Sequence, residues 1–440
     1  MRQILWFRRD LRICDNAILA NASGEVLPIF IFDSNILEKL PSDDLRVTFV
    51  FDSVIKLKEK LESIGLDLYI FFGKPVQIFE QFKSLQIDEV LVSCDFDDYA
   101  KSRDEIIAKE YKLRRFYDSW LIHPEETLKS DKTPYKVFTP FYKSLSAFFD
   151  NKIETFKPSQ NLKLINFESS HISLESLGFA RQKLPTFLNQ EPFEILNEFR
   201  SKIDNYDITR DLFYMDGTSN LSVFLRFGLI SPKQILNQIL TWREEGHNIE
   251  TFKKELFWRE FYNSILYHFP KSEFENFNNF EVQWQNDENL FEAWCEGKTG
   301  VPIIDAAMKH LNATGMMPNR LRMVVSSFLT KNLFIDWRWG ERYFAQKLLD
   351  YECSSNVGSW QWSASTGADA VPYFRVFNPY AQSLKFDPQC KFIKSNLPEL
   401  KNIPTKILHN EKAIEGYVTQ IVDVKFSAKK AIDVFAKSKG

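Results

Sequence analysis

Four short, uninterrupted apolar runs lie within the first 125 residues of the chain. They cover residues 4–7 (ILWF), 26–32 (VLPIFIF), 68–72 (LYIFF) and 89–93 (EVLVS). Continuous apolar runs of this length are typical of parallel strands that are buried on both faces of a sheet. We therefore expect each run to form one strand of a parallel sheet.

The segment between the second and third runs has the spacing of a helix. Its apolar residues recur at three- and four-residue intervals, at Val50, Val54, Leu57, Leu61 and Ile64. Ser42, Asp43 and Asp44 precede them and can cap the first N–H groups of a helix. Strand–helix–strand order predicts an α/β domain over residues 1–125, with a doubly wound, Rossmann-like parallel sheet. The G-x-G-x-x-G sequence of many dinucleotide sites is missing from it.

The rest of the chain divides into a connector and a helical region. Residues 126–195 mix prolines with polar residues, which predicts an interdomain connector. Helical spacing dominates residues 196–440, so we expect an all-α C-terminal domain there. Ser231 followed by Pro232 predicts a helix start. Further helices are expected over residues 302–311 and 319–337.

Composition and charge narrow the class of protein. The chain has 440 residues, enough for two domains, and a net charge of −3, which neither implies nor excludes a nucleic-acid partner. Five scattered cysteines without CxxC spacing predict a reduced, cytoplasmic protein. We expect no signal peptide, no membrane span and no dedicated metal site. Aromatic content is high at 15%, with ten tryptophans.

Three segments stand out chemically. GTSNLS (217–222) offers hydroxyls and backbone N–H groups to an anion at a helix start, although most such clusters are ordinary caps. ELFWREFY (255–262) places Glu255 and Arg259 four residues apart beside Trp258, a spacing that is equally typical of a surface ion pair. Residues 356–379 (NVGSWQWSASTGADAVPYFRVFNP) combine aromatic side chains with very few acids or bases.

Together these segments resemble the photolyase/cryptochrome family. The shared motifs follow one another along nearly the whole chain: WFRRDLRICDNAIL, YKVFTPF, GTSNLS, ELFWREFY, WCEGKTGVPIIDAAMKHLNATG and GSWQWSASTGADAVPYFRVFNP. Within the family the chain looks most like the microbial class I cyclobutane pyrimidine dimer (CPD) photolyases. The resemblance implies FAD in the helical domain and a light-driven repair of ultraviolet-damaged DNA. Because such a cofactor performs the chemistry, a site poor in acids and bases is expected.

The resemblance assigns two sets of residues to FAD. The phosphate and ribose side matches Tyr206, Thr218, Ser219, Asn220, Leu221 and Ser222. The isoalloxazine side matches Asn319, Arg322, Asp350, Glu352 and Asn356. We expect Arg322 and Asp350 to form an ion pair against the ring. Asn356 would lie beside flavin N5, where an amide can accept or donate. Plant cryptochromes resemble this pattern but carry aspartate at the place of Asn356, so asparagine here favours a repair enzyme.

The resemblance also assigns the DNA site. Glu255, Trp258, Met323 and Trp362 match the pocket for a dimer flipped out of the duplex. The two tryptophans would wall the bases, Glu255 would hydrogen-bond a pyrimidine edge, and Met323 would fill the remaining wall. Six residues match positions that contact DNA in the family: Arg210, Glu255, Arg259, Asn319, Arg320 and Gln382. The segment MMPNRLRM lacks the histidine that (6-4) photolyases carry there.

Two further features come from the resemblance. Trp360, Trp337 and Trp284 match the chain of tryptophans that carries electrons from the surface to the flavin. A second, light-harvesting chromophore is implied at the α/β domain, with Asp97 or Asp98 as candidate contacts. Its identity stays open between a folate, a deazaflavin, a second flavin and an empty site.

Four residues depart from the pattern of class I enzymes. Asn220 stands where arginine is frequent, Met316 replaces a tryptophan, Pro318 replaces a histidine and Glu352 replaces an aspartate. We expect these changes to alter the flavin environment and the affinity for the lesion rather than the reaction.

The alternative function is that of a cryptochrome, a flavin photoreceptor without repair activity. Cryptochromes commonly carry extended C-terminal tails. Here only about 60 residues follow Asn378, and they include further family-like sequence. We therefore expect a monomeric repair enzyme without a separate effector tail.

Overall fold

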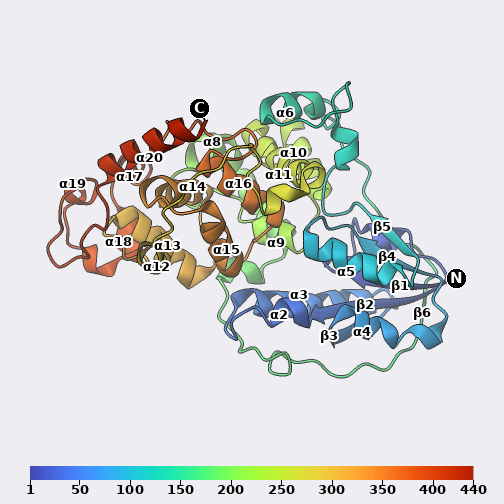
Figure 1. Cartoon of the computed structure of the whole chain (residues 1–440). Coiled ribbons are helices and arrows are strands. Elements are labelled where there is room, and N and C mark those ends of the chain that lie inside the picture. The colour runs from blue at the N-terminus through green and yellow to red at the C-terminus, as the bar shows by residue number, and fades with distance from the viewer. Residues whose placement is uncertain (440) are drawn as a thin grey trace. The chain divides into compact units, whose positions relative to one another are not determined.

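The computed structural model describes residues 1–439 (Figure 1), and its chain divides into two compact units. The first unit contains Met1–Lys132, Tyr142–Ser201 and Ser219–Glu260. The second contains Thr133–Phe141, Lys202–Thr218 and Phe261–Gly440. The predicted domain boundaries at residues 125 and 195 stay predictions.

A parallel sheet forms the centre of the first unit. Its strands are β1 (Arg2–Phe7), β2 (Glu25–Asp33), β3 (Tyr69–Gly73), β4 (Glu89–Ser93), β5 (Leu113–Phe116) and β6 (Lys163–Leu164). The order is β3-β2-β1-β4-β5, with β6 paired to β2, and every pairing is parallel. The four predicted strands are therefore confirmed, and the doubly wound α/β class with them.

Both faces of the sheet are buried, as the continuous apolar runs require. Leu5 and Phe7 of β1 belong to one apolar cluster, whereas Ile4 and Trp6 belong to another. Alternate side chains of a strand point to opposite faces, so the two clusters lie on opposite faces of the sheet. α3 (Leu45–Glu62) packs its apolar residues into the first cluster.

Two helices of the first unit begin where the sequence indicated. Asp44 caps α3 by accepting a hydrogen bond from the N–H of Arg46 at 2.8 Å. Ser231 and Gln234 form a reciprocal capping box at the start of α10 (Pro232–Glu244).

The remaining helices before residue 270, in either unit, are α1 (Ala17–Ala20), α2 (Ser34–Leu37), α4 (Pro75–Glu80), α5 (Asp98–Ala108), α6 (Phe138–Ser146), α7 (Pro192–Phe199), α8 (Tyr206–Thr209), α9 (Ser222–Arg226) and α11 (Glu250–His268).

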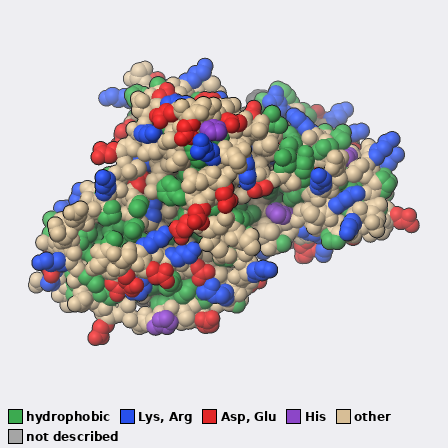
Figure 2. Space-filling view, turned by 180° about the vertical axis from the view of Figure 1, so that it is seen from behind, with side chains coloured by type: hydrophobic (Ala, Val, Ile, Leu, Met, Phe, Trp, Pro, Cys, Tyr) green, Lys and Arg blue, Asp and Glu red, His purple; other side chains and the backbone are tan. Residues whose placement is uncertain are grey.

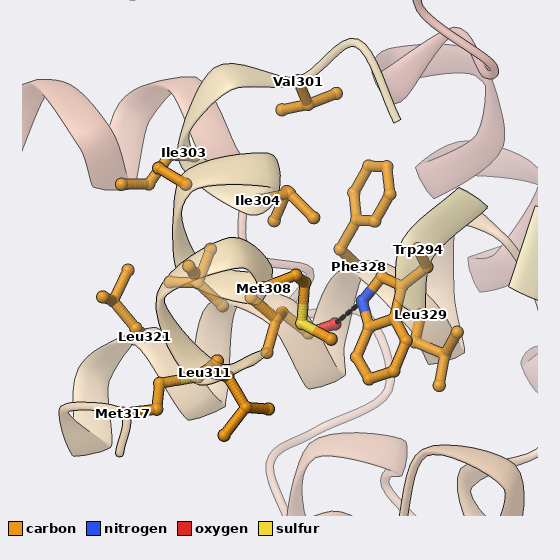
Figure 3. Close-up of a cluster of buried hydrophobic side chains, with 14 of the residues drawn as sticks. Trp294, Val301, Ile303, Ile304, Met308, Leu311, Met317, Leu321, Phe328 and Leu329 are labelled. Carbon is orange, nitrogen blue, oxygen red and sulfur yellow. Dashed lines mark hydrogen bonds between the residues drawn. The ribbon is translucent and has the colours of Figure 1, made fainter. Parts of the chain in front are cut away.

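The second unit is helical, as expected. Its later helices are α12 (Glu288–Glu296), α13 (Pro302–Thr314), α14 (Asn319–Ser327), α15 (Trp337–Lys347), α16 (Cys353–Ala364), α17 (Pro379–Phe386), α18 (Lys391–Asn396), α19 (Thr405–Leu408) and α20 (Val424–Lys439). Figure 3 shows its apolar core around Trp294, whose Nε1–H donates to the carbonyl oxygen of Val325 at 3.2 Å. Within residues 1–439, no helix combines the length and apolar character that crossing a bilayer requires.

The extent predicted for the helix over residues 319–337 is wrong. α14 ends at Ser327 and a π-helical segment, η6 (Phe328–Asn332), follows it. Phe334 then adopts a positive φ of 55°, which no helix can contain. Asp336 caps the next helix by accepting from the N–H of Arg338 at 2.9 Å. Apolar spacing continues through this break because the residues around it are buried, so periodicity alone hides it.

Replacing Ser231 with alanine is expected to destabilise the first unit by about 1–2 kcal/mol, because an N-cap is lost. The loss should fall at the upper end, since the same hydroxyl donates to the buried carboxylate of Asp15. Unfolding in denaturant measures the change in the free energy of unfolding. The control is Ser63→Ala, which removes an exposed hydroxyl hydrogen-bonded to the carbonyl of Lys60. Equal effects of the two changes would contradict the assigned role of Ser231.

Candidate active site

One helix of the second unit carries three of the predicted site residues. Asn356, Trp360 and Trp362 all lie on α16, and the first two are 8% and 2% exposed. Glu352 is the N-cap of this helix, because its carboxylate accepts from the N–H of Ser355 at 3.1 Å. The residue that departs from the family pattern thus holds the start of the helix. We infer that Glu352 fixes where the helix begins.

Arg322 and Asp350 form the predicted ion pair. Nη2 of Arg322 lies 3.0 Å from Oδ1 and 2.8 Å from Oδ2 of Asp350. Nε of Arg322 donates to the carbonyl oxygen of Met317 at 2.8 Å, which fixes the guanidinium plane. Arg322 belongs to α14, which packs against α16. The pair therefore lies beside the helix that carries Asn356.

Glu341 is a site residue that the sequence did not reveal. Nδ2 of Asn356 donates to Oε1 of Glu341 at 3.0 Å and to its carbonyl oxygen at 3.3 Å. Burial raises the pKa of Glu341, while hydrogen bonds from Asn356 and Tyr351 oppose that shift. With its Nδ2 engaged in this way, Asn356 offers its carbonyl oxygen to a further N–H donor. No spacing rule connects Glu341 with a residue on another helix, so the contact appears only in three dimensions.

The three predicted relay tryptophans share one apolar cluster. Trp337 and Trp360 are members of it, and Trp284 is packed against it. The exposed fractions are 0% for Trp337 and 2% for Trp360, whereas Trp284 is half-buried. Nε1–H of Trp337 donates to Oδ1 of Asn276 at 2.9 Å. Trp284 is the most exposed of the three, which is what a relay needs at its outer end.

Gly340 lets α15 approach the ring of Trp360. A Cβ atom at position 340 would lie 2.1 Å from Cη2 of Trp360, closer than real contacts allow. Phe344, one turn further along α15, meets the same ring edge-on at 5.0 Å. Trp294 contacts it at 6.1 Å from another side. Neighbours on two helices, α15 and α12, therefore fix the position of this indole.

The predicted DNA contacts of the second unit lie on several elements. Arg320 pairs with Asp211 at 2.7 Å, and its guanidinium lies 4.9 Å from the ring centre of Phe386. The guanidinium of Arg210 lies 5.4 Å from the ring of Tyr206. Both arginines thus stack on aromatic rings, an arrangement in which the guanidinium plane is held in a defined orientation.

The remaining pocket residues of the second unit have defined neighbours. Trp362 stacks on Phe377 with ring centres 6.3 Å apart and planes at 25°. Nδ2 of Asn319 lies 4.0 Å from Sδ of Met323, one turn along α14. Gln382 lies on α17, and its buried Oε1 has no hydrogen-bond partner among the described residues. The stack on Phe377 fixes the plane that Trp362 presents.

The phosphate-side residues 219–222 and the remaining lesion residues belong to the first unit, whereas Tyr206 and Thr218 belong to the second. Ser219, Asn220 and Leu221 precede α9, and Asn220 has a positive φ of 55°. Glu255, Trp258 and Arg259 lie on α11. The guanidinium of Arg259 lies 3.8 Å from the ring of Trp120, and its Nη1 donates to the carbonyl oxygen of Ser119 at 2.6 Å. Arg259 thus packs within its own unit, and its contact with DNA stays a prediction.

The candidate antenna residues lie at the start of α5. Asp97 is the N-cap and accepts from the N–H of Ala100 at 2.8 Å. Burial, and then repulsion from the carboxylate of Asp95, raises the pKa of Asp97. Asp98 is the first residue of the helix. One oxygen of Asp97 is therefore already used by the fold.

Two family models match the chain. One is described as DNA photolyase and covers residues 3–160, and the other is described as the FAD binding domain of DNA photolyase and covers residues 252–437. The deoxyribodipyrimidine photo-lyase of Alkalihalophilus pseudofirmus is 34% identical over 98% of this chain and 97% of its own length. That of Vibrio cholerae is 32% identical over 100% of both chains.

Solved structures of photolyases and of a cryptochrome are also similar to the chain. An archaeal photolyase from Sulfolobus tokodaii with two FAD molecules is 34% identical, with a TM-score of 0.85 over 99% of this chain and 100% of that chain. A cryptochrome from Synechocystis is 27% identical, with a TM-score of 0.88 over 99% of both chains. Because these matches run along nearly the full length of both partners, the chain belongs to the photolyase/cryptochrome family.

Proposed function

We propose that the chain repairs cyclobutane pyrimidine dimers in DNA by light-driven electron transfer from reduced FAD to the extruded dimer. The observation that carries this proposal is the buried Asn356, whose amide is held by Glu341. Relatives named deoxyribodipyrimidine photo-lyase match almost the full length of the chain, which supports the same activity. The reaction class is a carbon–carbon lyase.

The residues of the second unit fit a bound flavin. A guanidinium–carboxylate pair and a fixed amide suit a planar ring that has both carbonyl oxygens and N–H groups at its edge. Arg322, Asp350 and Asn356 supply those groups. When bound, FAD would supply light absorption and one-electron chemistry. Tyr206 and residues 218–222 are our candidates for the phosphate and ribose side.

The side chains of the site hold the flavin and the bases in position and conduct electrons; they do not transfer protons. Asn356 presents its carbonyl oxygen, because Glu341 occupies the other end of the amide. Trp362 presents a flat wall that Phe377 holds in place, and aromatic walls of this kind bind bases with about 1–3 kcal/mol each. A site built in this way needs few acids and bases, which agrees with the sequence of α16.

The DNA-binding proposal rests on local arginines rather than on net charge. The net charge is −3, and basic and acidic side chains are interspersed on the face shown in Figure 2. Arg210 and Arg320 are our candidates for phosphate contacts, because stacking on aromatic rings preorients them. Gln382 offers a buried amide oxygen that no residue within 1–439 hydrogen-bonds.

We further propose an antenna chromophore at the first unit, with Asp97 and Asp98 as candidate contacts. The relative from Sulfolobus tokodaii holds two FAD molecules, which supports a second chromophore in this family. We also propose a monomer located in the cytoplasm, where the five cysteines would remain reduced.

The second candidate function is that of a cryptochrome. The TM-score of 0.88 to the cryptochrome from Synechocystis favours it, but the photolyase from Sulfolobus tokodaii reaches 0.85 with higher identity. Backbone similarity of this size does not separate repair from signalling. Asn356 favours repair, because the plant cryptochromes resemble the same pattern but carry aspartate at this place.

Repair is tested directly with a dimer-containing oligonucleotide. Purified protein carrying fully reduced FAD is illuminated with blue or near-ultraviolet light, and restored thymines are counted by chromatography. We expect repair in the light and none in the dark. Inactivity of the fully reduced protein under light would overturn the proposal and favour the cryptochrome function.

Replacing Glu255 with alanine is expected to weaken binding of the lesion by about 10- to 100-fold, because a hydrogen bond to a charged group contributes about 1.5–3 kcal/mol. Repair per absorbed photon should fall, and the FAD content should stay unchanged. Titration with damaged and undamaged oligonucleotides measures the effect. The control is Glu244→Ala, which removes an exposed carboxylate on α10. Wild-type affinity of the Glu255 variant would refute its role.

Replacing Trp337 with phenylalanine should block the light-driven reduction of oxidised FAD, because the middle of the relay is lost. Repair by protein reduced beforehand should stay normal. Absorption spectra during illumination follow the reduction. The matched control is Trp339→Phe on the same helix, which removes a half-buried tryptophan outside the predicted relay. Normal photoreduction in the Trp337 variant would remove this residue from the relay.

A further inference from the structure

A second, smaller aromatic cluster surrounds the outer end of the predicted relay. We call it the outer cluster; its members are Val282, Phe334, Ala431 and Phe435, with Phe280, Trp284, Tyr373 and Val434 packed against them. Two members come from the C-terminal helix α20, far from Trp284 in the sequence. The last helix of the chain thus contributes to the surroundings of a predicted redox residue.

Phe435 is the centre of the outer cluster. It is 0% exposed, and its ring lies 5.8 Å from that of Trp284 at 75°, an edge-to-face contact. It also meets Phe334 at 6.1 Å and Tyr373 at 6.4 Å. Phe334 contacts Trp284 from its own position at 5.2 Å. The indole of Trp284 is therefore held by two phenylalanine rings.

α20 is held within the second unit by hydrogen bonds in its first turn and by a cation–π contact further along the helix. Nδ2 of Asn332 donates to the carbonyl oxygen of Val424 at 3.0 Å and to Oγ of Ser427 at 2.9 Å. Nζ of the buried Lys331 lies 3.5 Å from the ring centre of Phe435. Both anchors belong to the π-helical segment η6.

The same lysine connects this region to α16. Nζ of Lys331 donates to the carbonyl oxygen of Ala364 at 3.1 Å and to Oγ of Ser365 at 2.9 Å. These atoms form the C-terminus of the helix that carries Asn356 and Trp360, where a cation is favourable. Lys331 therefore fixes Phe435 relative to the inner end of the relay.

We propose that Phe435 is a positioning residue of the relay, which holds Trp284 in place and closes one side of its indole to water. The proposal rests on the proposed function, because it requires the tryptophans to conduct. Electron transfer between aromatic rings falls steeply with their separation, so a ring held on two sides conducts more reproducibly than a mobile one. α20 is thereby part of the redox path rather than a mere end of the chain.

The electron balance of the outer step is simple. Light-driven transfer removes one electron from Trp337, and Trp284 replaces it. A soluble thiol then returns one electron to Trp284, becoming a thiyl radical and releasing its proton to water. The open side of the half-buried indole is where the thiol can approach. The side covered by Phe435 keeps water away from the oxidised ring until that encounter.

The test replaces Phe435 with leucine in the complete protein carrying oxidised FAD. We expect a several-fold loss in the rate of photoreduction, with repair by protein reduced beforehand unchanged. Acrylamide should also quench Trp284 more strongly in the dark; the share of this residue is the difference between each protein and its Trp284→Phe counterpart. The matched control is Phe426→Leu on the same helix, whose side chain is 68% exposed. This control should behave as wild type.

The results distinguish a failure of the positioning role of Phe435 from a failure of the tryptophan relay on which that role rests. If Trp284→Phe photoreduces normally, the relay assignment fails and the role of Phe435 fails with it. If Trp284→Phe is slow while the Phe435 variant keeps both a wild-type rate and wild-type quenching, only the positioning role is overturned. Should Phe435→Leu not fold, Phe435→Met removes the ring and places an unbranched, flexible apolar side chain there instead, and the same two measurements decide.

Discussion

The close approach of α15 to α16 is the constraint on which the site depends. The ring of Trp360 occupies the space that any side chain at position 340 would need. Because interiors are packed as densely as crystals, a shift of one helix moves the other. Asn356, one turn before Trp360 on α16, receives its partner Glu341 from α15. One helix contact therefore sets both the conducting ring and the polar group offered to the flavin.

This arrangement explains how a protein can support demanding chemistry with few reactive groups. The polar groups of the site are held by the fold: Nδ2 of Asn356 by Glu341, and the guanidinium of Arg322 by Asp350 and the carbonyl oxygen of Met317. Groups fixed in this way need no rearrangement when charge moves, which is the usual source of electrostatic preorganisation. The structure also shows where many of the aromatic residues lie. The predicted relay and the apolar clusters of the second unit account for much of the buried tryptophan.

The sequence predicted the elements whose signal is local. Four strands were continuous apolar runs, and the start of α10 was a Ser-Pro pair. β5 was missed because its sequence LRRF points two exposed arginines outward. The break after Ser327 was missed because burial on every side makes the pattern look helical. The pair of Arg322 and Asp350 came from family resemblance, and Glu341 from neither source, since its contact joins two helices.

The first unit is built from three separate segments of the chain, and this affects its folding during translation. β6 pairs with β2 of its sheet, and its apolar cluster includes Leu174, Leu177 and Phe179, all far beyond the last central strand. A nascent chain stopped at residue 125 would leave that apolar surface uncovered, and such surfaces favour aggregation. The first unit also needs Ser219–Glu260, so it cannot be complete until those residues have left the ribosome. Ribosomal pausing before that point would favour capture by chaperones.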